Sequence, residues 1–129
     1  MAFRDMSTPL KHVRALGPAR SGTEQFWHQR LTAIANVPLV IAFVLIVVAL
    51  LGRNHAAVVQ ILGSPLIAVI MLLFIISVTT HMRIGMQVII EDYVHDEARK
   101  FMLLIANTFF AVAVGLASAF AILMLSFKV

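Results

Sequence analysis

The sequence predicts an all-α membrane protein with three transmembrane helices. Hydrophobic residues make up 61% of its 129 residues and charged residues only 12%, whereas soluble domains carry about 25% charged residues. Three stretches are almost free of charge, and each is longer than the roughly 20 residues that a helix needs to cross a bilayer. The chain has no cysteine, which excludes disulfides, thiolate metal sites and iron–sulfur ligation within this chain.

The N-terminal residues 1–20 are predicted to form a basic cytoplasmic tail, followed by a three-helix membrane anchor over residues 21–129. The tail lacks the apolar run of a secretory signal. Its Ser and Arg residues are too sparse to favour a transit peptide. Ser21 and Glu24 have the spacing of a capping box, which predicts that the first long helix begins with Ser21 as its N-cap.

The first span is expected at about residues 28–52, because no residue from 31 to 51 carries a charge. Pro38 lies inside this stretch. Membrane helices tolerate proline, often with a kink, so we expect one span rather than two.

The second span is expected at about residues 62–91, starting at Ile61 or Pro65. Its only ionisable residues before the acidic end are His81 and Arg83. An ionisable side chain in hydrocarbon is costly and usually has a ligand, a partner or a proton to handle. This span therefore carries the candidate site.

The third span is expected at about residues 100–127 and is free of charge between its ends. Gly115 and Ala119 have the small-xxx-small spacing that lets membrane helices approach closely. Small residues at lipid-facing positions would produce the same pattern, and both interpretations stay open here.

Basic residues are distributed unevenly between the two sides of the predicted spans. Seven Lys or Arg residues lie on the side of the N-terminal tail and the loop at residues 91–100, against Arg53 and Lys128 on the other side. The positive-inside rule then predicts a cytoplasmic N-terminus and a periplasmic C-terminus. The pI near 10.4 is explained by this topology, so no nucleic-acid partner is expected.

His81 is predicted to lie near the middle of the bilayer. Tyr93 follows it by twelve residues, about 18 Å along a helix, and the hydrocarbon half-thickness is about 15 Å. Gly85 lies one turn from His81 on the same face and leaves room for a flat group or a close helix. The imidazole would serve as an axial haem ligand or would hydrogen-bond to a neighbouring helix.

A haem held by two histidines would need its second ligand from another polypeptide. The remaining histidines, His12, His28, His55 and His95, lie outside the predicted spans or at their ends. The chain therefore supplies half a site in the haem interpretation.

The polar residues around His81 have both functional and ordinary interpretations. Arg83 points away from His81 and needs an anion or carbonyls, unless its side chain extends to the interface. Candidate anions are a haem propionate, a carboxylate of another subunit and a lipid carboxylate. Asp92 and Tyr93 are either ordinary interfacial residues or a quinone site in which the phenol donates to a carbonyl.

Several short motifs, taken in order, resemble the D-type hydrophobic membrane-anchor subunits of succinate dehydrogenase, respiratory complex II. They are Arg30-Leu31-Thr32-Ala33, His81-x-x-Ile84-Gly85, Gln87-Val88 and Asp92-Tyr93-Val94. The resemblance covers most of the chain but adds little before residue 21. Two departures are Arg83, where an apolar or aromatic residue is expected, and Gln87 directly after Met86.

The resemblance implies that His81 is one axial ligand of haem b and that a companion C-type anchor subunit supplies the other. It implies a ubiquinone-reduction site containing Tyr93, Asp92 and Arg30. Arg30 would also lie near the haem propionates, and the further candidates for propionate or pocket contacts are Arg83, His28 and Gly85.

The same resemblance implies a role as a subunit without succinate chemistry of its own. The chain would dock a flavoprotein subunit with FAD and an iron–sulfur subunit, and would contact membrane lipid. We expect the bacterial inner membrane rather than the mitochondrial one, because the N-terminus starts compactly. The alternatives are a fumarate reductase-type anchor and a non-redox three-span membrane scaffold.

Overall fold

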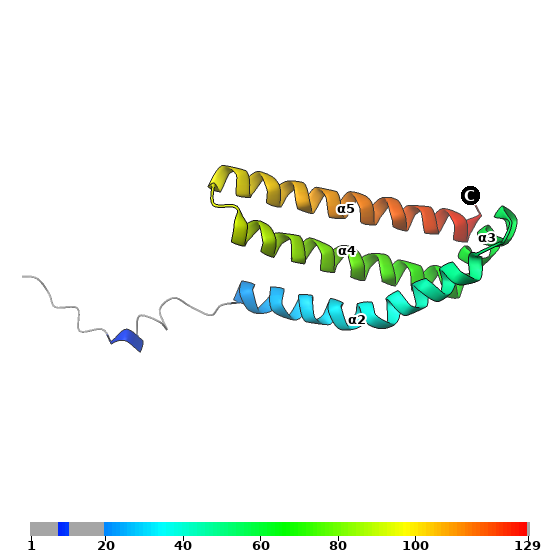
Figure 1. The fold of residues 1–129 in the computed structure, drawn as a ribbon, viewed down its shortest axis with the longest axis horizontal. Coiled ribbons are helices and arrows are strands. Elements are labelled where there is room, and N and C mark those ends of the chain that lie inside the picture. The colour runs from blue at the N-terminus through cyan, green and yellow to red at the C-terminus, as the bar shows by residue number, and fades with distance from the viewer. Residues whose placement is uncertain (1–7, 11–19, 129) are drawn as a thin grey trace, which may run out of the picture.

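The structure is a computed structural model that describes residues 8–10 and 20–128. Residues 20–128 form the helices α2 (Arg20–Leu50), α3 (His55–Leu62), α4 (Pro65–Tyr93) and α5 (Glu97–Phe127). The three long helices lie roughly along one axis with α4 between α2 and α5 (Figure 1). Each of the three is long and apolar enough to cross a membrane, which confirms the prediction of an all-helical chain with three candidate spans.

The first long helix starts slightly earlier than the capping-box motif predicts. Arg20 is already helical, so Ser21 lies within α2, and the Ser21 side chain lies outside the described part of the structure. Pro38 lies inside α2, and the helix curves but does not break (Figure 1), as expected for a proline that removes one backbone donor. The boundary of the predicted tail stays a prediction, because most of residues 1–20 lie outside the described ranges.

A short helix, α3, lies between the first two spans and was not predicted. Asn54 caps it with an extended backbone, and its side-chain oxygen accepts a hydrogen bond from the Ala57 N–H at 2.9 Å. The second long helix begins at Pro65, one of the two predicted starts, and not at Ile61. Gly63 and Ser64 end α3, and Pro65 begins α4 at a first-turn position where the missing N–H costs nothing.

The loop between α4 and α5 is short, and α5 begins at a capping residue. Asp96 is the N-cap, and its carboxylate accepts a hydrogen bond from the Arg99 N–H at 3.2 Å. This loop and the start of α2 lie at one end of the helices, whereas α3 and the C-terminus lie at the other (Figure 1). The start of α2 and the α4–α5 loop thus lie at the same end, as the count of basic residues on each side assumed. The compartment that each end faces stays a prediction.

The helices bury few side chains between them. Ile84, at 2% exposure, is the most buried apolar residue, and others with low exposure are Ala68, Ala111 and Ile122. Many large apolar side chains are exposed along all three long helices. In a membrane, such surfaces face lipid or the helices of a partner protein.

Candidate functional site

His81 lies on α4 and forms a polar contact with α2. Its Nδ1 lies 3.0 Å from Thr32 Oγ1. Thr32 Oγ1 in turn lies 2.8 Å from the carbonyl oxygen of His28 and 3.2 Å from that of Gln29, both within α2. The half-buried imidazole is thus held at one ring nitrogen by this chain.

Beyond Thr32, toward the C-terminal end of α2, further hydrogen bonds and a ring contact join α2 to α4. Ser77 Oγ donates to Asn36 Oδ1 at 2.7 Å, and Ser77 is itself buried. The rings of Phe43 and Phe74 then stack with their centroids 4.5 Å apart. This line of residues, from Thr32 and His81 to Phe43 and Phe74, is called the polar seam below.

Gly85 leaves room for a small group beside His81, bordered by α2. A Cβ built on Gly85 would meet Gln29 Nε2 at 3.7 Å, an ordinary contact distance, and no other described atom within 4 Å. A methyl group would therefore fit at this position. On the same face of α2, Gln29 Oε1 and Gln25 Nε2 are buried without a hydrogen-bond partner in the described structure, and a buried polar atom without a partner costs free energy.

The sequence patterns did not identify Gln29, Asn36 or Ser77 as candidate site residues, and Thr32 entered only as part of a motif. A signal was present in their spacing. Gln25, Gln29, Thr32 and Asn36 recur every three or four residues, so they share one face of α2. A polar stripe inside an apolar helix marks the face that meets another polar element.

His28 lines a groove on the opposite side of the polar seam from Gly85. The groove has a volume of about 460 Å³ and is lined by His28, Thr32, Ala35, Ser77 and Thr80 together with apolar residues of both helices. At 100° per residue, His81 and Gly85 lie about 40° and 80° to one side of Ser77, whereas Thr80 lies about 60° to the other. The structure does not bring His28 and Gly85 together.

Arg83 lies on the side of α4 that faces α5, away from His81. It lines a groove of about 370 Å³ between these helices with Thr79, Ala111, Gly115 and others. Its backbone carbonyl accepts a hydrogen bond from Asn107 Nδ2 at 2.9 Å. Within the described residues no carboxylate pairs with its guanidinium, so its partner remains unassigned.

Small residues of α5 pack against α4 beside Arg83. A Cβ built on Gly115 would lie 3.5 Å from Thr79 Oγ1, and Ala111 is only 4% exposed. The pattern of small residues predicted at Gly115 and Ala119 therefore serves contact between helices. We call this contact, with Thr79, Ala111, Gly115, Ala119 and Asn107, the small-residue seam.

Arg30 lies on the side of α2 away from Thr32. Its guanidinium carbon is 5.0 Å from the centroid of the Phe26 ring, a cation–π contact. Thr32 follows Arg30 by two positions, about 200° around a helix. This chain by itself does not bring Arg30 to His81, and the predicted propionate and quinone contacts of Arg30 stay predictions.

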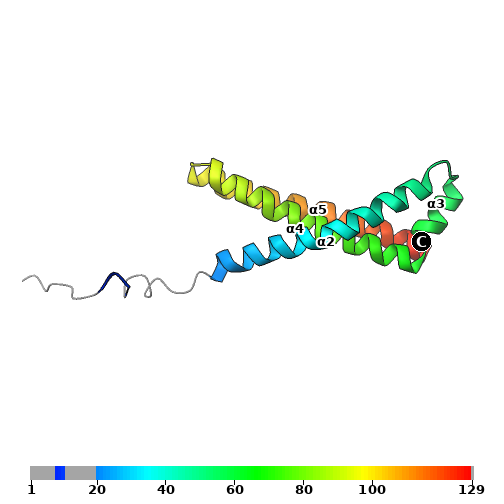
Figure 2. The same cartoon turned by 60° about the horizontal axis from the view of Figure 1, so that its bottom comes forward.

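Asp92 and Tyr93 lie at the end of the same continuous helix as His81. Both are exposed, and Tyr93 is 79% exposed. Because α4 runs unbroken to Tyr93, the expected separation of about 18 Å along the axis applies. In this region the start of α2 and the end of α4 diverge (Figure 2), so the described helices leave the tyrosine uncovered.

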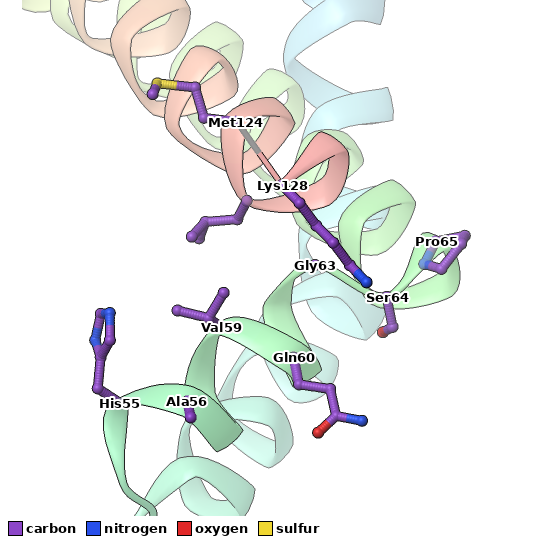
Figure 3. Close-up of a pocket in the computed structure, with 10 residues that line it drawn as sticks. His55, Ala56, Val59, Gln60, Gly63, Ser64, Pro65, Met124 and Lys128 are labelled. Carbon is purple, nitrogen blue, oxygen red and sulfur yellow. The ribbon is translucent and has the colours of Figure 1, made fainter.

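Another cavity lies at the other end of the helices, far from Tyr93. It has a volume of about 720 Å³ and lies between α3, the start of α4 and the end of α5, as Figure 3 shows for His55, Gln60, Ser64 and Lys128. Gly63 closes the packing there, because a Cβ on it would lie 2.6 Å from the Leu125 carbonyl oxygen. Size alone does not make this cavity the candidate site.

The residues around His81 suit a haem that takes one axial ligand from this chain. Within the described residues no group of three or more His, Cys, Asp or Glu side chains is placed to hold a metal ion. A single imidazole, held at Nδ1 and beside the room left at Gly85, agrees instead with a shared site. The second axial ligand would come from another chain.

Comparisons with known proteins identify the family of the chain. Residues 4–115 match the family model described as succinate dehydrogenase/fumarate reductase transmembrane subunit. The chain is 30% identical over 102 residues to a succinate dehydrogenase hydrophobic membrane anchor subunit of Paracoccus denitrificans, covering 79% of each protein. It is 27% identical over 108 residues to such a subunit of Rickettsia bellii, covering 84% of this chain and 86% of the relative.

A third relative is a succinate dehydrogenase membrane anchor subunit of Reclinomonas americana, 34% identical over 86 residues that cover 64% of this chain and 72% of the relative. No solved structure matches the chain. The family match spans α2, α3, α4 and most of α5, the region that contains His81 and Tyr93. The chain therefore belongs to the succinate dehydrogenase/fumarate reductase transmembrane subunits and is a multi-pass membrane anchor subunit of the succinate dehydrogenase complex.

Proposed function

We propose that this anchor subunit supplies His81 as one axial ligand of a b-type haem and Tyr93 and Asp92 as part of a ubiquinone-reduction site. The observation that carries the proposal is the placement of His81 and Tyr93 on one unbroken helix. The former is half-buried and held by α2, and the latter is exposed at the helix end.

The haem would lie between this chain and a companion C-type anchor subunit that supplies the second histidine. His81 would bind iron through Nε2, since Nδ1 faces Thr32. A bound haem would supply one-electron storage close to the quinone site. Gly85 would leave space for the edge of the group, and the unpartnered amide of Gln29 lies at the border of that space.

Tyr93 would act directly on the quinone. Reduction of a quinone to a quinol takes two electrons, here from iron–sulfur clusters on another subunit, and two protons. The phenol O–H would donate to one quinone carbonyl and stabilise the negative charge that develops on its oxygen. Asp92, the preceding residue, would orient the phenol or pass protons from the aqueous side.

The predicted orientation agrees with this chemistry. The charge bias places the tail, Asp92 and Tyr93 on the cytoplasmic side and the C-terminus in the periplasm. The flavoprotein and iron–sulfur subunits would then dock beside Tyr93 and cover it. Arg30, exposed on α2 near this end, would contact the propionates or the quinone from the companion side. His28 and Arg83 remain candidates for contacts on the other faces.

A fumarate reductase-type complex is the second candidate, because the matching family description names both activities. The same His81 and Tyr93 roles would apply, with a quinone of lower potential as the electron donor. All three relatives are succinate dehydrogenase subunits, which favours succinate oxidation. A comparison of turnover with ubiquinone and with a low-potential quinone separates the two.

Two variants of the purified complex test the proposal. His81→Leu should change the reduced-minus-oxidised spectrum of the b-type haem, whereas Tyr93→Phe should leave that spectrum unchanged. Tyr93→Phe should instead lower succinate-dependent ubiquinone reduction by about 10²-fold, the effect of losing one donor to a developing oxyanion. Succinate-dependent reduction of a soluble artificial acceptor should be normal in both variants.

The haem role of His81 and the quinone role of Tyr93 can each be contradicted by a separate result. A wild-type haem spectrum in His81→Leu would remove His81 as a ligand. Unchanged ubiquinone turnover in Tyr93→Phe would remove the tyrosine from the quinone site.

A further inference from the structure

We propose that Thr32 is a positioning residue for His81, because its hydroxyl oxygen accepts the Nδ1–H of the imidazole and leaves the Nε2 lone pair free to bind iron. This inference rests on the proposed haem role of His81. It adds a residue of the first span to a site whose ligand is on the second span.

The direction of the Thr32–His81 hydrogen bond follows from counting protons. The Thr32 hydroxyl has one proton and lies 2.8 Å from the carbonyl oxygen of His28, which can only accept. A hydroxyl of a helical threonine commonly donates to the carbonyl four residues earlier. With its proton used there, Thr32 Oγ1 can only accept from His81 Nδ1, at 3.0 Å.

The tautomer of His81 follows from that direction. A neutral imidazole carries one N–H, so protonation at Nδ1 leaves the lone pair on Nε2. Nε2 is then the free nitrogen, on the ring edge opposite Thr32. Metal-binding histidines usually donate their other N–H to such an acceptor, which fixes the tautomer and ring orientation and raises ligand basicity.

The backbone around Thr32 holds the acceptor in place. Thr32 lies in the middle of the polar stripe of α2, and its own carbonyl oxygen lies 3.4 Å from Ser77 Oγ on α4. The next contact along the polar seam is the hydrogen bond between Ser77 and Asn36. The ring of His81 is therefore oriented by the crossing of two helices, as well as by its own rotamer.

The test is a redox titration of haem b in the purified complex carrying Thr32→Val. Valine keeps the shape of threonine but removes the acceptor. A less basic ligand stabilises oxidised iron less, so at a fixed potential the ratio of reduced to oxidised haem should rise. The expected change in this ratio is up to about tenfold, the low end of the effects of mutating a residue that is hydrogen-bonded to a metal ligand. A tenfold change equals ~59 mV for a one-electron couple.

Two further variants make the result specific. Thr32→Ser keeps the hydroxyl and should titrate like wild type. Thr79→Val is the matched control: its hydroxyl also donates to a helix carbonyl, that of Ile75 at 2.6 Å, but it packs against Gly115 of α5. It should leave the haem potential unchanged.

The outcomes separate this inference from the proposed function. If His81→Leu changes the haem spectrum while Thr32→Val titrates like wild type, the role of Thr32 is overturned and the ligand role of His81 stands. A shift in Thr32→Ser as large as that in Thr32→Val would also overturn it, because the hydroxyl would then not be the cause. If Thr32→Val fails to assemble, the serine variant and Thr32→Ala decide between these outcomes.

Discussion

The two sides of α4 make contacts of opposite chemical character. Toward α2 it presents Ser77 and His81 to the hydrogen-bonding groups of Asn36 and Thr32. Toward α5 it presents Thr79 to Gly115, with Ala111 buried nearby. The polar seam orients an ionisable ring in an apolar medium, whereas the small-residue seam brings two backbones together by close packing.

The difference explains why one helix can be both a structural and a functional element. Close packing with small residues involves no buried polar side chain that must find a partner. A polar contact in hydrocarbon costs free energy unless every group is paired. The hydrogen bonds of the polar seam pair its groups from Thr32 to Ser77, and the unpaired buried atoms, at Gln25 and Gln29, lie on α2 before the seam begins.

The largest expected effect comes from filling the two glycine positions with the same side chain. Gly115→Leu should destabilise the α4–α5 packing by about 1–3 kcal/mol, the usual cost of overpacking, because Thr79 lies against this position. Gly85→Leu should disturb folding less, since a Cβ at Gly85 meets only the end of the flexible Gln29 side chain, at 3.7 Å, but should exclude haem from the assembled complex. The measurements are the melting temperature of the purified complex and haem absorbance per flavin.

The glycine comparison would fail if the two variants behaved alike. If Gly85→Leu lowered the melting temperature of the complex but left its haem content unchanged, the space beside His81 would serve packing within this chain.

An intermediate effect is expected for Ser77→Ala in the polar seam. The change removes the donor to Asn36 Oδ1, and hydrogen bonds between membrane helices contribute about 0.6–1.7 kcal/mol. The melting temperature of the complex should fall slightly, with a normal haem spectrum, because His81 keeps Thr32. The double variant with Asn36→Leu is the control, since removing both partners should cost less than the sum of the single changes.

The smallest effect is expected for Asn107→Leu in the small-residue seam. The lost bond runs from Asn107 Nδ2 to the backbone carbonyl of Arg83, and that carbonyl is within a helix whose backbone supplies its own partner. We expect a destabilisation of about 0.6 kcal/mol, read as a small decrease in melting temperature. A loss larger than that of Ser77→Ala would show that the α4–α5 contact also depends on polar interactions.

The main elements of the fold could be predicted because their signals are local. A run without charge identifies each span, and Pro65 marks the start of the second one. The short helix α3 was missed because eight residues after Asn54 carry too weak a periodic signal between two spans. The second span begins at Pro65, the later of its two predicted starts, because α3 takes up the residues before it.

The candidate site was predicted less completely than the fold. His81, Gly85, Asp92 and Tyr93 were selected from spacing along one helix, and an unbroken α4 supports that geometry. Thr32 and Gln29 lie about fifty residues earlier, and their nearness to His81 and Gly85 depends on how α2 crosses α4. Arg30 and Arg83 were grouped with the haem candidates, yet the structure places them on other faces.

The sequence by itself determined that three apolar helices are long enough to cross a membrane and that one of them carries His81, the candidate haem ligand, and Tyr93. Those conclusions rest on sums of hydropathy and on helical periodicity, which are properties of single segments. Only the tertiary structure decided which hydroxyl meets His81, which side of α4 stays open and which seam is polar. Those features depend on the crossing of helices that are distant in the chain, and no local pattern specifies that crossing.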